Sequence, residues 1–316
     1  MMIATTRPRW SSSTLEGIKK FSMNVQPHGG LFQRFQTDPL SSLSPEVKST
    51  ITPASLQCMS CCGMSYFGVV TALVMITSLT VTLPTVYESE QLFIRVSVAL
   101  FIFANIVVNF IIVSSRRSFY SGRQSDVDVL PGPDWKRCDD CDQKIPPRVH
   151  HCILCRRCIV SRDHHCFFTG SCVGRDNQRH FVAFCFHCCI GAGYSLYVAV
   201  SYVNTAYPDN MLVNYLLPVT ILEWILGYES FGFLYFVCFL YICWMTCFGS
   251  GAILVWQTVV IILGVTTHEF RSMPRHLPKN VLRNVRAVCG PYWFLNFVCP
   301  LLTIQAGNQH AIYKPI

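Results

Sequence analysis

The sequence predicts an α-helical multi-pass membrane protein with four transmembrane helices and a cysteine-rich domain between the second and third of them. Of its 316 residues, 51% are hydrophobic and only 13% are charged, about half of the roughly 25% charged residues typical of soluble domains. Apolar stretches of about 20 residues, the length that crosses a bilayer core, recur along the chain. We reject a soluble protein with long buried helices, because these stretches have no polar face to present to water.

Four of the apolar stretches are predicted to cross the membrane. In chain order they are residues 64–83, 92–113, 181–202 and a stretch within 231–264. A fifth, residues 211–227, carries Asn214, Pro218 and Glu223. We expect this fifth stretch to lie in the lumen or along the membrane interface, because a crossing there would move the basic C-terminal tail out of the cytosol.

The distribution of Lys and Arg predicts the orientation. Six of the 25 basic residues precede residue 64, twelve lie at 114–180, and six follow residue 264. Four spans put these three segments on one side of the membrane, which the positive-inside rule makes cytosolic. The net charge of +8 then faces anionic lipid or a phosphorylated cofactor, and no nucleic acid is expected as a partner.

These assignments divide the chain into five parts. They are a cytosolic N-terminal segment (1–62), spans 1 and 2 (63–114), a cytosolic cysteine-rich zinc domain (115–180), spans 3 and 4 with the lumenal segment (181–264), and a cytosolic C-terminal tail (265–316). Three cysteines, Cys58, Cys61 and Cys62, stand just ahead of the first span, where juxtamembrane thiols can be S-acylated. The alternative is that they are small, buried apolar side chains.

The cysteine-rich segment has the spacing of a metal site. Seven of the 18 cysteines fall between residues 138 and 172, together with four histidines. Disulfides are rare in the cytosol, and Cys pairs two residues apart are the usual knuckle of a structural zinc site. The segment is too short and polar to fold by apolar burial alone, so bound metal would stabilise it. Two tetrahedral sites use eight of the eleven candidate ligands.

The spacing favours Cys166 as the surplus thiol, because it belongs to no Cys pair spaced by two residues. It follows Asp163, His164 and His165 directly. A catalytic thiol needs a base, and an imidazole held by a carboxylate supplies one. The spacing leaves open which of the two histidines faces the metal and which faces the thiol.

The segment resembles the DHHC protein S-acyltransferases, also called palmitoyltransferases, as a divergent member. The similarity extends beyond the tetrapeptide and covers Cys138 to Phe181, including "PPRVHHCILCRRC" and "CVGRDNQRHF". The residues Thr266-Thr267-His268-Glu269 resemble the Thr-Thr-x-Glu motif of that family, and the four-span layout also matches. Two departures stand out, since Phe167-Phe168 replaces the usual Pro-Trp and the Asp-Pro-Gly after the second span is absent.

The resemblance implies a role for each matching residue. One structural zinc ion would be held by Cys138, Cys141, His151 and Cys158, and a second by Cys152, Cys155, His165 and Cys172. Cys166 would be the nucleophile, His164 its base, and Asp163 the group that orients the imidazole. Thr267 would contact Asp163, Asn177 would support the site, and His150 would have no metal to bind.

The activity implied by the resemblance is transfer of a long-chain acyl group from palmitoyl-CoA to Cys166, and then to a cysteine of a substrate protein. The implied partners are membrane lipid and membrane-associated proteins with cytosolic cysteines. The implied location is the Golgi or endoplasmic reticulum membrane, with the active site facing the cytosol. Candidates for contact with CoA phosphates or anionic lipid are Arg148, Arg156, Arg157 and Arg162.

Two alternatives belong to other functional classes. One is a RING-like membrane zinc module acting as a ubiquitin ligase, which needs two metals but no surplus thiol. The other is a catalytically inactive family member that acts as a scaffold. The intact Asp163, His164 and Cys166 argue against both.

Overall fold

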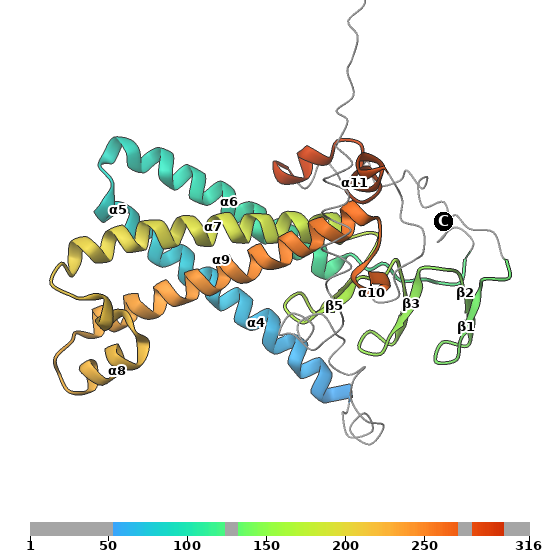
Figure 1. The fold of residues 1–316 in the computed structure, drawn as a ribbon, viewed down its shortest axis with the longest axis horizontal. Helices are drawn as coiled ribbons and strands as arrows, with labels where there is room; N and C mark the ends of the chain where they lie inside the picture. The colour runs from blue at the N-terminus through green and yellow to red at the C-terminus, as the bar shows by residue number, and fades with distance from the viewer. Residues whose placement is uncertain (1–52, 124–131, 271–279, 300–316) are drawn as a thin grey trace, which may run out of the picture. The chain divides into compact units, whose positions relative to one another are not determined.

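The structure is a computed structural model that describes residues 53–123, 132–270 and 280–299. These residues belong to one compact unit, Ser49–Ile316. Within the described ranges the chain forms four long helices, three two-stranded β-sheets and several short helical segments (Figure 1). Nearly all of the predicted N-terminal segment 1–62 lies outside the described residues.

Four helices in the described ranges are long and apolar enough to cross a membrane, which confirms the predicted number of spans. The first is built from α4 (Pro53–Thr77), the π-helical turn η1 (Ser78–Thr82) and α5 (Leu83–Val86). The others are α6 (Ser89–Ser115), α7 (Gln178–Ala206) and α9 (Phe231–Leu263). The apolar stretches cover Cys61–Val86, Gln91–Ser115, Gln178–Ala206 and Phe231–Leu263.

The π-helical turn in the first span is explained by the proline that follows it. Pro84 follows it at the start of α5, and a proline ring inside an α-helix collides with the carbonyl four residues earlier. The N–H of Leu83 bonds to the carbonyl of Ser78, five residues back, instead of four. The wider turn lets the helix continue past the proline, as π-bulges commonly do.

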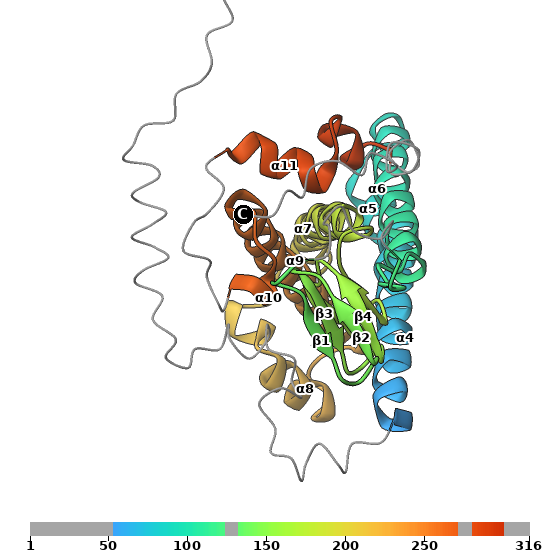
Figure 2. The same cartoon turned by 90° about the vertical axis from the view of Figure 1, so that its right-hand side faces the viewer.

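The helix α7 lies between α6 and α9 in the end-on view (Figure 2). Its contact with α9 is close because each helix presents a cysteine to a glycine of the other. The sulfur of Cys189 lies over Gly251 and that of Cys247 over Gly193, and a methyl group at either glycine would lie 3.3 Å from the facing sulfur. The two sulfur atoms are 4.0 Å apart. Small residues permit this approach, as in many membrane helix pairs.

The stretch 211–227 contains no helix long enough to cross a membrane. It contains a 3₁₀ turn, η3 (Leu212–Tyr215), and the nine-residue helix α8 (Leu217–Ile225). Nine residues of helix span about 13 Å, less than half of the bilayer core. Many of its large apolar side chains are exposed, Leu212 and Ile225 among them. This exposure agrees with the predicted position along a membrane interface.

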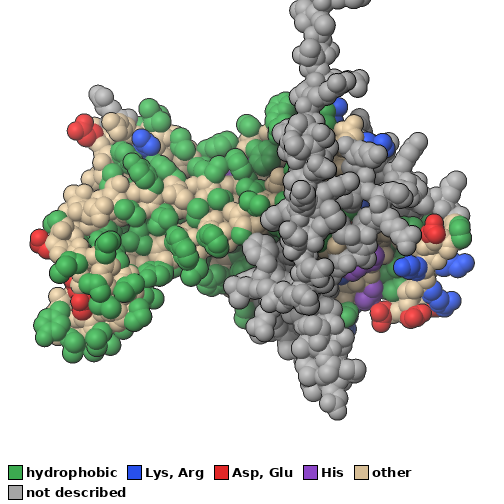
Figure 3. All heavy atoms as spheres, in the orientation of Figure 1, with side chains coloured by type: hydrophobic (Ala, Val, Ile, Leu, Met, Phe, Trp, Pro, Cys, Tyr) green, Lys and Arg blue, Asp and Glu red, His purple; other side chains and the backbone are tan. Residues whose placement is uncertain are grey.

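The cysteine-rich domain follows α6 and precedes α7. Its three antiparallel hairpins are β1 (Lys136–Cys138) with β2 (Gln143–Ile145), β3 (Val149–Cys152) with β4 (Arg157–Val160), and β5 (His164–Cys166) with β6 (Ser171–Val173). Hydrophobic side chains cover the visible face of the long helices, whereas charged ones gather at these hairpins (Figure 3).

After α9 the chain returns to the cysteine-rich domain and then to the helices. The short helix α10 (Thr267–Phe270) lies beside the hairpins, and α11 (Val281–Cys289) is followed by the 3₁₀ turn η4 (Trp293–Phe297). The side chain of Asn284 donates to the carbonyl of Ile262 at 2.8 Å. This bond satisfies a carbonyl at the C-terminal end of α9 that has no partner within its own helix.

The α7–α9 contact predicts a pair of contrasting substitutions. Gly251→Leu should destabilise the protein by about 1–3 kcal/mol, because the added side chain collides with Cys189. Gly249→Leu is the matched control, since a Cβ atom at Gly249 meets nothing within 4 Å. Thermal unfolding in detergent measures both, and equal melting temperatures for the two variants would contradict the packing described.

Candidate active site and metal centres

The first metal-type cluster joins the hairpins β1–β2 and β3–β4. The ligand atoms of Cys138, Cys141, His151 and Cys158 all lie within 4.8 Å of one another. His151 and Cys158 are paired across β3 and β4, and Cys141 lies in the turn after β1. Nδ1 of His151 is 3.3 Å from the sulfur of Cys141 and 3.6 Å from that of Cys138.

The second cluster joins β3–β4 to β5–β6. It contains Cys152, Cys155, His165 and Cys172, again with ligand atoms within 4.8 Å of one another. Nδ1 of His165 is 3.4, 3.8 and 3.6 Å from the sulfurs of Cys155, Cys152 and Cys172. These are the same eight residues that the resemblance implies as ligands, divided between the two sites in the same way.

The interleaving of the two clusters follows from strand geometry. His151 and Cys152 are neighbours on β3, and successive side chains of a strand point to opposite faces. One therefore enters the first cluster and the other enters the second. Both knuckles also end with a residue of positive φ, Asp142 (47°) and Arg156 (51°), so both turns close in the same way.

The donors suit a zinc ion. Zn–S bonds of about 2.3 Å and Zn–N bonds of about 2.0–2.1 Å, arranged as a tetrahedron, separate sulfur from nitrogen by about 3.6 Å. The nitrogen–sulfur distances in the second cluster, 3.4–3.8 Å, lie around that value. Three thiolates and one imidazole in a closed set also match the usual composition of structural zinc sites. Each cluster could hold one such ion.

Cys166 belongs to neither cluster and lies where the cysteine-rich domain meets the helices. Its side chain is buried in an apolar group that includes Ile106 and Val113 of α6 and Phe181 and Phe184 of α7. Phe67 of α4 and Leu254 of α9 pack against the same group. All four spans therefore contribute apolar side chains to the group that contains this thiol or to its border.

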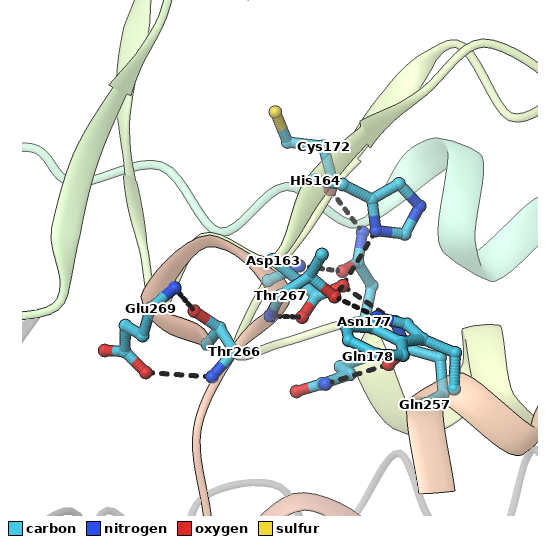
Figure 4. Close-up of polar contacts among 11 residues, drawn as sticks. Asp163, His164, Cys172, Asn177, Gln178, Gln257, Thr266, Thr267 and Glu269 are labelled. Carbon is cyan, nitrogen blue, oxygen red and sulfur yellow. Dashed lines mark hydrogen bonds and ion pairs between the residues drawn. The ribbon is translucent and has the colours of Figure 1, made fainter. Parts of the chain in front are cut away.

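The side chain of Asp163 accepts four hydrogen bonds (Figure 4). It is 2% exposed. One carboxylate oxygen accepts from the backbone N–H of Thr267 at 2.6 Å. The other accepts from the Thr267 hydroxyl at 3.0 Å, from Nε2 of Gln257 at 2.7 Å and from Nδ1 of His164 at 2.8 Å. The expected contact between Thr267 and Asp163 is thus present, and the cysteine-rich domain is joined to the segment after span 4.

The electrostatics of Asp163, His164 and Cys166 favour a reactive thiolate. Burial alone would raise the pKa of Asp163, but its bonds to His164, Thr267 and Gln257 hold that pKa below the ordinary value. Burial opposes protonation of His164, yet Asp163 and Cys166 together raise its pKa to about 10. Burial would likewise raise the pKa of Cys166, and the neighbouring imidazole lowers it. The thiolate is the nucleophilic form of cysteine.

The two phenylalanines that follow Cys166 lie against the first span through their backbone. A Cβ atom at Gly63 of α4 would lie 2.5 Å from the backbone oxygen of Phe167. The ring of Phe167 packs edge-on against the imidazole of His165, with centroids 5.5 Å apart. Phe168 is half exposed. The first span therefore touches the backbone of the residue that follows Cys166.

Asn177 joins three elements at the end of the second span. Its Oδ1 accepts from the N–H of Gly174 at 2.8 Å. Its Nδ2 donates to the carbonyls of Val113, Arg116 and Cys172 at 3.0–3.2 Å. Two of these carbonyls lie at the C-terminal end of α6, where helix carbonyls have no partner of their own. The residue thus fixes α6 and β6 at the start of α7.

One ion pair was not expected from the sequence. The guanidinium of Arg148 binds both carboxylate oxygens of Glu269, at 2.6 and 2.7 Å. The carboxylate also accepts from the N–H of Thr266 at 2.9 Å. Glu269 therefore fixes the segment that carries Thr267 against the cysteine-rich domain. Arg148 and the Thr-Thr-x-Glu motif were both visible in the sequence, but the sequence did not show that they pair.

This pairing changes the list of candidate phosphate ligands. Arg148 is held by Glu269, and Arg162 is buried. Arg156 and Arg157 are exposed, and the guanidinium of Arg157 lies over the ring of Phe119. His150 stacks on His268, with ring centroids 4.0 Å apart, and belongs to neither cluster.

The fold and the site define a class: a multi-pass membrane protein with two Cys₃His clusters and a Cys–His–Asp group at the junction of its domains. Residues 133–273 match the family model "DHHC palmitoyltransferase". Palmitoyltransferase ZDHHC22 of Rattus norvegicus is 25% identical over 268 residues, which cover 81% of this chain and 97% of that relative. Probable palmitoyltransferase ZDHHC24 of Homo sapiens is 31% identical over 178 residues, which cover 54% of this chain and 61% of that relative.

These matches confirm the resemblance drawn from the sequence. Residues 133–273 thus match a DHHC palmitoyltransferase domain, and the chain is similar to palmitoyltransferases over 81% of its length.

Metal analysis tests the division of ligands. Purified protein should contain about two zinc ions per chain, because each cluster supplies four donors. Cys166→Ser should still contain about two, whereas Cys155→Ser should contain about one or fewer, since a closed site loses a ligand. Elemental analysis by mass spectrometry measures the ratio. A loss of zinc in Cys166→Ser would contradict the placement of this cysteine outside both clusters.

Proposed function

We propose that the protein is a palmitoyl-CoA-dependent protein S-acyltransferase that works through a thioester on Cys166. The observation that carries the proposal is the position of this thiol outside both metal-type clusters, beside His164 and among apolar side chains of all four spans. The names of the relatives, palmitoyltransferases, support the same activity.

The first step makes the acyl-enzyme. His164 holds the proton of the Cys166 thiol while Asp163 accepts from its Nδ1 and keeps the ring in place. The thiolate attacks the carbonyl carbon of the acyl-CoA thioester, and the bond between that carbon and the CoA sulfur breaks. The proton held by His164 passes to the departing CoA thiolate.

The second step transfers the chain to a substrate protein. The thiol of a substrate cysteine gives its proton to His164, and its sulfur attacks the thioester carbonyl on Cys166. The Cys166 thiolate leaves, and the enzyme returns to its starting state. One thioester replaces another in each step, so positioning and thiolate activation are the main tasks of the protein.

The apolar group around Cys166 gives the acyl chain a place to lie. Its members come from α4, α6, α7 and α9. Each methylene buried there contributes about 0.8 kcal/mol, so long chains would bind better than short ones. In this proposal the two zinc ions have a structural role, holding the hairpins that present Asp163, His164 and Cys166.

The proposal includes an orientation and a location. The cysteine-rich domain would face the cytosol, as the Lys and Arg distribution predicts, in the Golgi or endoplasmic reticulum membrane. Substrates would be membrane-associated proteins with cytosolic cysteines near the lipid surface. Exposed Arg156 is the best-placed of the four arginines to meet a CoA phosphate or anionic lipid.

The proposed activity predicts a strong effect of Cys166→Ser. Cells that express the wild type and receive a clickable palmitate analogue should show hydroxylamine-sensitive label on the protein and on a co-expressed substrate. Both labels should fall at least about tenfold in Cys166→Ser, since serine supplies no thiolate.

The comparison needs a background without the juxtamembrane thiols. Cys61 and Cys62 are exposed, and the side chain of Cys58 lies outside the described residues, so all three are replaced by serine in both proteins. Unchanged substrate labelling in Cys166→Ser would contradict the proposal and favour a scaffold or a ubiquitin ligase.

The contact between the first span and Phe167 predicts a second effect. Gly63→Ala should lower the rate of Cys166 acylation about tenfold, because the methyl group displaces the backbone next to the nucleophile. Gly68→Ala on the same helix is the matched control, since its methyl group meets nothing within 4 Å. Equal rates in the two variants would show that α4 does not position the site.

A further inference from the structure

Two glutamine side chains from different spans lie next to each other beside the carboxylate of Asp163. Gln178 is the first residue of α7, and Gln257 lies in α9, two turns before its end. Both side chains are almost completely buried, at 3% and 1% exposure. Nε2 of Gln178 donates to Oε1 of Gln257 at 3.1 Å, and Nε2 of Gln257 donates to Asp163 at 2.7 Å (Figure 4).

The directions of these bonds are not interchangeable. A carboxylate can only accept hydrogen bonds, so Gln257 must turn its amide nitrogen toward Asp163. Its carbonyl oxygen then points at Gln178, and Gln178 must donate an N–H to that oxygen. The charge at Asp163 therefore fixes the orientation of both amides, and the spans at 178 and 257 are held relative to the carboxylate.

The oxygen that receives this bond is the one that binds the imidazole. Oδ2 of Asp163 accepts from Gln257 at 2.7 Å and from Nδ1 of His164 at 2.8 Å. Thr267, in the segment after span 4, donates to the carboxylate through its N–H and its hydroxyl. Among the described residues of the long helices, Gln257 bonds directly to Oδ2 of Asp163, whereas Trp256 of α9 acts on this oxygen only through the Thr267 hydroxyl, to which its Nε1 donates at 2.9 Å.

We infer that Gln257 is a positioning residue for acyl transfer at Cys166, and that Gln178 holds it in the orientation that presents its N–H to Asp163. The inference rests on the proposed function. Gln257 acts through Asp163 and His164 and touches neither acyl-CoA nor the reacting sulfur. The amide pair thereby makes the alignment of the nucleophile depend on the packing of span 3 against span 4.

The test is a double-substitution cycle on purified, zinc-loaded protein. The rate of thioester formation on Cys166 is measured over a range of palmitoyl-CoA concentrations for the wild type, Gln257→Met, Gln178→Met and the double variant. Methionine keeps the length and shape of the side chain and removes its hydrogen bonds.

Gln257→Met should lower the rate at saturating palmitoyl-CoA about tenfold, the usual consequence of losing a bond to a charged group. The half-saturating concentration of palmitoyl-CoA and the zinc content should stay within about twofold of the wild-type values. The melting temperature should stay within a few degrees of that of the wild type. Gln178→Met should lower the rate about threefold. The double variant should match Gln257→Met, because Gln178 acts only through Gln257.

Thr258→Val is the matched control for loss of a polar group on α9. Within the described residues, the Thr258 hydroxyl bonds to the carbonyl of Leu254 in its own helix. The Thr258→Val variant should therefore form the thioester at the wild-type rate. The inference is overturned if Gln257→Met reacts as fast as the wild type, if its loss of rate parallels loss of folded protein, or if the two substitutions act additively. If the wild type itself forms no thioester on Cys166, it is the proposed function that fails, whatever the glutamines do.

Discussion

The arrangement of the site depends on one buried carboxylate. Asp163 is withdrawn from water between the cysteine-rich domain, the last span and the segment after it. An isolated carboxylate is costly to bury, and it is tolerated only where hydrogen bonds and a cationic neighbour replace its water. Four donors meet that demand, and each donor comes from an element that must be correctly placed for the bond to form. The chemistry of one residue thereby constrains three parts of the fold.

The metal-type clusters solve a different problem. The hairpins around Cys166 have only three or four residues in each strand, too few to build a stable sheet by themselves. Because His151 and Cys152 point to opposite faces of one strand, the two clusters share that strand and brace each other. Three of the four residues in each cluster are cysteines. His165, a member of the second cluster, lies between His164 and Cys166 in the chain. The second cluster therefore fixes the strand that carries both of these residues.

Much of the architecture follows from the sequence alone. The four spans were predictable because lipid requires long apolar helices, and the resemblance to the DHHC family implied eight metal ligands that the structure does bring together. The contact between Thr267 and Asp163, implied by the resemblance, is also present. Such features depend on local pattern or on motifs that stand together in the chain.

The remaining features depend on partners that are far apart in sequence. Gln257 is separated from Asp163 by 94 positions, and Arg148 from Glu269 by 121. A buried glutamine in an apolar span is nevertheless a signal, because polar groups are expensive in a membrane and usually have a partner. The sequence could have indicated that Gln257 has a partner, but only the packing of α7, α9 and the hairpins identifies it.

The central claim is that Cys166 is free of metal and able to carry an acyl chain while both clusters remain intact. Native mass spectrometry of purified protein after incubation with palmitoyl-CoA tests it most directly, with fragmentation to locate the chain. The account predicts a species that keeps two zinc ions and gains one palmitoyl group on Cys166. Acylation accompanied by loss of zinc, or a chain found only on other cysteines, would contradict it.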